Sequence, residues 1–108
     1  MASYTITAEI TIERQEGATN DLEITVSELF DMATFEPTFV VMKKDKTVLF
    51  TKLPADFVIV GQDITAAVAI EDTAGYVGKH RWQLEVNRGT ERYIIGRGDF
   101  LIVDDITT

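Results

Sequence analysis

The chain of 108 residues contains eighteen acidic and ten basic residues, giving a formal net charge of −8, and it contains no cysteine. Apolar residues make up 45% of the sequence, enough for a packed core, so a disordered chain is excluded and residues 1–108 are expected to form a single domain. The absence of cysteine excludes disulfides, thiolate zinc sites and cysteine nucleophiles. The acidic surplus disfavours a nucleic-acid partner, because phosphate binding requires clustered Lys and Arg.

No segment of the sequence indicates a membrane partner. Residues 1–6 contain neither a basic region nor an apolar stretch, so no signal peptide is expected. No apolar run approaches the roughly 18 residues that a membrane-spanning helix requires.

The first strand is expected over residues 4–13, where apolar and polar residues alternate almost strictly. In this register one face is buried (Ile6, Ile10 and Ile12) and the other faces solvent (Thr7, Glu9 and Thr11). A turn-rich connection at 15–20 leads to a second alternating strand at 22–26. Residues 27–36 fit neither the helical nor the strand period, so a short helical turn or an irregular crossover is expected there.

The middle of the chain contains three further strand signals. The continuous apolar run 39–42 predicts a central strand buried on both faces, and a charged tip at 43–46 returns into a strand at 48–50. Residues 57–60 form another strand. Residues 64–70 alternate, and although three alanines would also suit a helix, the β-branched residues favour a strand.

The last third of the chain predicts a long antiparallel hairpin. Residues 79–86 alternate, residues 87–90 turn the chain, and residues 91–103 return. Gly96 and Gly98 interrupt the returning strand, which indicates a bulge or a close approach of backbone and side chain. With seven or eight short antiparallel strands, the chain is expected to be all-β, a sandwich or a small barrel.

Catalytic residues are scarce. His80 is the only histidine, and it shares strand parity with Trp82, so packing is expected rather than acid–base chemistry. Neither Ser3 nor Ser27 lies in a nucleophile-elbow pattern. The sequence therefore predicts a protein without enzymatic activity and without a catalytic residue.

Two acidic pairs and one tripeptide suggest ligands but have simpler explanations. Glu71-Asp72 and Asp104-Asp105 could bind calcium through oxygen ligands, yet such pairs more often lie in solvated turns and tails, so no metal and no cofactor is expected. Arg97-Gly98-Asp99 spells the integrin-binding tripeptide. It lies inside a strand-like run, so a structural role is expected.

The aromatic residues fit a core better than a binding platform. Tyr76 and Trp82 could stack against a sugar ring, but both share parity with Leu84, and Trp82 is expected between the two sheets. Four phenylalanines are further core candidates: Phe39, Phe50, Phe57 and Phe100. Apolar residues on both faces at Ile94-Ile95 suggest an exposed interface.

The closing hairpin carries a family resemblance. Its pattern is a glycine, an alternating strand with Trp and Leu, a polar turn, a strand interrupted by glycine and a final hydrophobic strand, here Gly78, Trp82, Leu84, Gly89, Gly96 or Gly98, Phe100 and Val103. This pattern resembles the Ig-like β-sandwich modules of tailed-bacteriophage virion proteins. The resemblance covers about thirty residues well and most of the chain loosely, and His80 stands where these modules often have tyrosine.

The resemblance implies an Ig-like β-sandwich that is a non-enzymatic structural protein of a phage virion. Such a module occurs in tail, baseplate, neck or head-fibre components and docks onto other virion structural proteins. It implies a homo-oligomer located in the virion and assembled in the bacterial cytoplasm. The alternative left open is a carbohydrate-binding or adhesion sandwich, with Tyr76, Trp82 or Tyr93 as the stacking residue.

Overall fold

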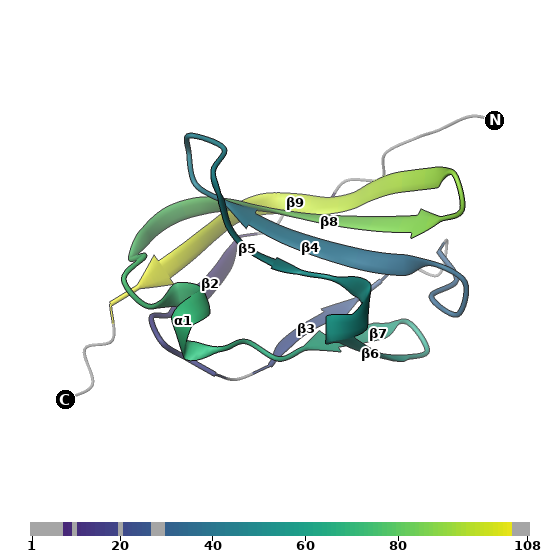
Figure 1. Cartoon of the computed structure of the whole chain (residues 1–108), viewed down its shortest axis with the longest axis horizontal. Coiled ribbons are helices and arrows are strands. Elements are labelled where there is room, and N and C mark those ends of the chain that lie inside the picture. The colour runs from purple at the N-terminus through teal and green to yellow at the C-terminus, as the bar shows by residue number, and fades with distance from the viewer. Residues whose placement is uncertain (1–7, 10, 20, 27–29, 105–108) are drawn as a thin grey trace.

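The structure is a computed structural model that describes residues 8–9, 11–19, 21–26 and 30–104. In that part of the chain, nine strands form two sheets that face each other (Figure 1). The strands are β1 (Ala8–Glu9), β2 (Ile12–Gln15), β3 (Leu22–Thr25), β4 (Glu36–Met42), β5 (Val48–Lys52), β6 (Phe57–Val60), β7 (Asp63–Ala66), β8 (Gly78–Arg88) and β9 (Glu91–Val103). A 3-10 turn, η1 (Pro54–Asp56), precedes β6, and a short helix, α1 (Ile70–Thr73), follows β7.

The larger sheet is built on the β8–β9 hairpin. Its strand order is β1-β9-β8-β4-β5, and β2 also pairs with β9, further along the same edge. A register shift after Leu84, opposite Ile95, confirms the bulge predicted near the β9 glycines. The hairpin supplies the predicted antiparallel pair, turning at Gly89–Thr90.

The expectation of antiparallel strands throughout was wrong for the first two strands. Both β1 and β2 run parallel to β9. These pairs place the first two strands of the chain beside the last one. Local alternation shows which face of a strand is buried but not which distant strand lies beside it, so the sequence pattern could not reveal the parallel pairing.

The smaller sheet has the order β3-β7-β6 and is antiparallel. Its inward-facing residues belong to the same buried cluster as those of the larger sheet, for example Leu22 and Ile64 with Leu84 and Phe100. Two sheets that share one core in this way make a sandwich-like all-β fold, which confirms the predicted fold class.

Aromatic rings fill the centre of the core. Phe39 stacks on Trp82 at a centroid distance of 5.6 Å, and Phe50 meets Phe100 edge-on at 5.8 Å. All four predicted core phenylalanines, Phe57 included, are buried, and Trp82 is 5% exposed on the inner face of β8. The predicted roles of these aromatic residues in the core are confirmed.

The first predicted strand is only partly described. Thr11 is exposed, as expected, and Ile12, which was expected to be buried, is half-buried and packs against the core. Arg14 is buried on the same face as Ile12. Ile6, Thr7 and Ile10, and the side chain of Glu9, lie outside the described residues.

Three other predictions need correction. In β4, Phe39 and Val41 are buried whereas Val40 and Met42 are only half-buried, so the strand is fully buried on one face alone. The strand predicted over residues 64–70 ends at Ala66, and Ile70 instead begins α1 with 58% of its surface exposed. At Ile94-Ile95 both residues are half-buried, and Ile95 packs against the core, so no exposed apolar edge forms there.

The segment before β4 is an irregular crossover, as predicted. Of residues 27–36, the described part from Phe30 turns around Asp31, whose backbone oxygen accepts hydrogen bonds from the amides of Thr34 and Phe35. Phe30 and Phe35 are buried and lie against the ring of Tyr93. In the described part of the chain, no helix is long and apolar enough to cross a membrane.

Candidate functional site

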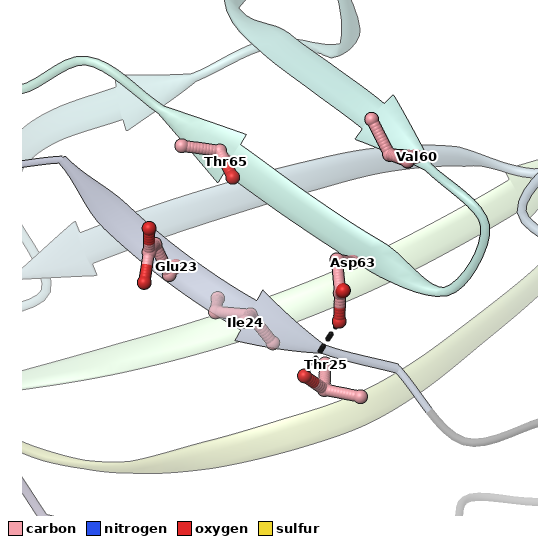
Figure 2. Close-up of a pocket in the computed structure, with 6 residues that line it drawn as sticks. All are labelled: Glu23, Ile24, Thr25, Val60, Asp63 and Thr65. Carbon is pink, nitrogen blue, oxygen red and sulfur yellow. Dashed lines mark hydrogen bonds between the residues drawn. The ribbon is translucent and has the colours of Figure 1, made fainter.

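The outer face of the smaller sheet is the candidate functional site. Two rows of side chains cross it from β3 through β7 to β6, and Figure 2 shows all of their members except Val58. The first row is Glu23, Thr65 and Val58, and the second is Thr25, Asp63 and Val60. Around these rows lies a shallow depression of about 510 Å³. We refer to these six residues as the sheet B surface.

The strand period creates this surface. Leu22 in β3 and Ile64 in β7 are buried, so their neighbours Glu23, Asp63 and Thr65 point outward. Asp63 Oδ1 accepts a hydrogen bond of 2.8 Å from the hydroxyl of Thr25, which fixes the second row across β3 and β7. The surface is thus polar on two strands and apolar on the third.

β6 is the apolar strand at the end of the smaller sheet. Val58 and Val60 point outward and expose 66% and 70% of their surface, and Ile59 exposes 36%. In the described part of the chain, β7 is the only strand paired with β6. An end strand of this kind presents unpaired backbone groups together with apolar side chains, which is the usual form of a strand-docking edge.

The strands of the sheet B surface come from acidic stretches of the sequence. All three of its strands come from the stretches between Arg14 and Lys43 and between Lys52 and Lys79, and neither stretch contains a Lys, Arg or His. The first stretch holds six acidic residues and the second four. All ten basic residues of the chain therefore lie outside these two stretches.

The larger sheet carries charges of both signs in pairs. Asp99 on β9 accepts from Arg81 at 3.0 Å and lies 3.4 Å from Lys79. Partial removal from water raises the pKa of the Asp99 carboxyl, but the hydrogen bonds and charges of Arg81 and Lys79 outweigh it and hold that pKa below its ordinary value. The Arg97-Gly98-Asp99 tripeptide therefore lies inside β9, where Asp99 pairs with residues of β8, and it has the structural role that was expected.

The residues considered for catalysis or sugar stacking do not form a site. His80 is buried, and its Nε2 lies 2.7 Å from the backbone oxygen of Tyr76. Trp82 and Tyr93 are buried, so neither presents a ring to a sugar. Tyr76 was expected in the core but exposes 36% of its surface, with Lys43 Nζ 5.1 Å from its ring centroid.

The acidic pairs are also separated. Asp72 caps α1 by accepting from the amide of Ala69, and it forms an ion pair of 2.8 Å with Lys52, whereas Glu71 is exposed. Asp104 is exposed, and Asp105, Ser3 and Ser27 lie outside the described residues. Across residues 8–9, 11–19, 21–26 and 30–104, no group of three His, Cys, Asp or Glu side chains could hold a metal ion.

Neither a protein-family model nor a curated protein matches this chain. The functional argument therefore rests on the surface itself. Sequence reasoning identified β6 as a strand but missed its exposure. The sequence did contain one sign of this surface, because two long stretches lack basic residues. Only the strand order shows that all three strands of the smaller sheet come from these stretches.

Proposed function

We propose that this chain is a non-enzymatic structural module of a phage virion that docks onto other virion proteins through the β6 edge. The observation that carries the proposal is the end strand of the smaller sheet, where Val58 and Val60 are more than half exposed and no described strand covers the outer side. Exposed apolar side chains beside an unpaired strand edge are typical of surfaces that a partner covers. The resemblance of the closing hairpin to phage virion modules supports the assignment to a particle.

The arrangement of the core also supports a structural role. The large aromatic residues pack against one another between the sheets, and the depression on the sheet B surface is lined by polar side chains together with Ile24 and Val60, with no histidine or basic residue among its lining residues. The two carboxylates there, Glu23 and Asp63, lie in different rows on different strands, and Asp63 accepts from the Thr25 hydroxyl, so they are better placed to attract a positively charged partner than to act as an acid–base pair. Docking is the function that this surface serves best.

The proposal is tested on purified phage particles. We expect mass spectrometry to find the chain among the virion proteins. A chain found only in the cytosol of infected cells would contradict the proposal.

A matched pair of variants tests the surface. Val58→Thr with Val60→Thr keeps the side-chain shape but removes exposed methyl surface, and we expect less of this variant in particles. Val48→Thr is the control: Val48 lies on β5 and is 53% exposed, and this variant should be incorporated into particles as well as the parent chain. Equal incorporation of both variants would show that the β6 edge is not the docking surface. Specific binding of the isolated chain to a glycan array would instead support the carbohydrate-binding alternative.

A further inference from the structure

The backbone of β6 offers one complete donor–acceptor pair at its outer side. β6 joins β7 through a two-residue turn at Gly61–Gln62, in which Gly61 has φ 60°, so the flanking residues Val60 and Asp63 face each other as a hydrogen-bonded pair. Because bonding alternates along an antiparallel ladder, the N–H and C=O of Ile59 point away from β7. The Phe57 N–H is already used, since it donates to the backbone oxygen of Pro54.

An added strand would continue both rows of the sheet B surface. Its outward side chains would lie beside Val58 and Val60, which already expose most of their surface, and its inward side chain would lie beside Ile59. The aliphatic part of a Lys or Arg side chain at an outward position would cover the exposed methyl groups, and an apolar side chain would pack beside Ile59. Both the burial of these methyl groups and the two backbone hydrogen bonds at Ile59 would stabilise the bound strand.

The negative charges beside the β6 edge favour a positively charged partner. Asp63 lies on β7, so an added strand would stand two strand spacings, roughly 10 Å, from it. A Lys or Arg side chain on the outward face spans that distance together with the aspartate side chain. Glu23 adds a second negative charge to the same face, and no basic residue from these strands competes for either carboxylate.

We infer that the β6 edge binds an extended basic segment of another protein, which adds as a fourth strand to the smaller sheet and places Lys or Arg toward Asp63. This inference rests on the docking function proposed above and names the chemistry of the partner.

A second copy of this chain fits the edge less well. Each copy has a net charge of −8, so pairing two β6 edges would bring two acidic faces together. β6 has only four residues, so the pairing would join two short strands without the charge complementarity that a basic segment supplies.

The test uses the full chain and short synthetic peptides. The probe alternates lysine and valine, a first control replaces each lysine by glutamate, and a second control keeps the lysines but is N-methylated on the backbone amides. We expect the probe to bind, with an affinity that falls as salt is added, and neither control to bind comparably. Equal binding of the N-methylated peptide would overturn the inference, because charge alone would then explain the binding.

Three variants locate the binding edge. Ile59→Pro removes the outward N–H without removing a bond to β7, and it should weaken the probe by about tenfold or more. Ile59→Ala keeps that N–H and should weaken binding by no more than about threefold. Asp63→Asn keeps the oxygen that accepts from Thr25 but removes the charge, and should weaken binding by about threefold while reducing its salt dependence.

The outcomes separate this inference from the proposed function. Unchanged binding by Ile59→Pro overturns the inference, and if that variant does not fold, the N-methylated peptide makes the same test on the unaltered chain. Sedimentation of the chain alone as a dimer that Ile59→Pro dissociates would assign the edge to a second copy and overturn the inference too. Peptide binding by a chain that is absent from particles would uphold the edge chemistry and reject the virion assignment.

Discussion

The indole ring of Trp82 lies directly against the backbone of Gly96 on the neighbouring strand. A Cβ added at Gly96 would be 2.8 Å from Cη2 of Trp82, closer than such atoms approach in folded proteins. The bulge in β9 lies beside this contact, and the indole ring also stacks on Phe39. Gly96 is therefore required by the side chain that crosses it.

Substitution of Gly96 by alanine is expected to destabilise the domain by about 1–3 kcal/mol, because the added methyl group overpacks a buried site. Chemical denaturation of Gly96→Ala against the parent chain measures this loss. The control is the double variant Gly96→Ala with Trp82→Phe, in which a smaller ring leaves room for the methyl group. If the two substitutions were additive, steric contact between these residues would not be the cause.

Removal of the Trp82 ring is expected to cost about 3–5 kcal/mol, since it leaves a cavity beside Phe39 in the middle of the core. That loss is a large part of the stability of an ordinary small domain. Tyr76→Ala is the matched control, because Tyr76 is partly exposed and should cost less than about 1 kcal/mol. An unchanged melting temperature for Trp82→Ala would contradict the buried position.

The elements that the sequence predicted well are those with one fully buried face. β8 alternates strictly from His80 to Val86, and a shift by one residue would turn Leu84 to solvent and Glu85 into the core. Because a register shift would cost so much free energy, the local pattern predicts the register reliably. The same argument predicted the buried positions of the core phenylalanines and of His80.

The elements that the sequence predicted poorly depend on tertiary contacts. After Ala66 the alternation continues, yet the chain leaves the sheet, because Asp72 caps α1 through the amide of Ala69 and pairs with Lys52 on β5. The parallel pairing of β1 and β2 and the exposure of β6 depend on strand order. Local sequence carries no record of that order, so the candidate site emerged only from the structure.

The ion pair between Lys52 and Asp72 is expected to stabilise the end of the sandwich at α1. Its side chains are only 13% and 16% exposed, and Asp72 Oδ2 also accepts from the amide of Ala69. Asp72→Asn leaves the Lys52 ammonium group without its carboxylate and should cost about 1–3 kcal/mol. The double variant with Lys52→Met should lose less than the sum of the single losses. Additive losses in urea denaturation would show that the two residues do not stabilise each other.

The carboxyl group of Glu91 is expected to titrate below the ordinary range of glutamate. Arg88 Nε donates to Glu91 Oε2 at 2.7 Å, and this hydrogen bond lowers the pKa of Glu91, opposed by partial removal from water. Because the folded pKa lies below the unfolded one, the stabilisation is present at neutral pH and above the ordinary glutamate pKa. It is lost as the pH falls through the folded pKa.

Titration of Glu91 by NMR measures this effect directly. Arg88→Ala should raise the pKa of Glu91 toward its ordinary value, and it should also loosen the turn at Asp31, because the Arg88 guanidinium lies 4.3 Å from the ring centroid of Phe35 and donates to the hydroxyl of Thr34. Arg92→Ala is the control. Its guanidinium pairs with Glu85, at 2.7 Å, so Arg92→Ala removes an equal charge from the neighbouring strand β9 without touching the Glu91 hydrogen bond. An equal rise in both variants would mean that general charge, and not the Arg88 hydrogen bond, sets the pKa of Glu91.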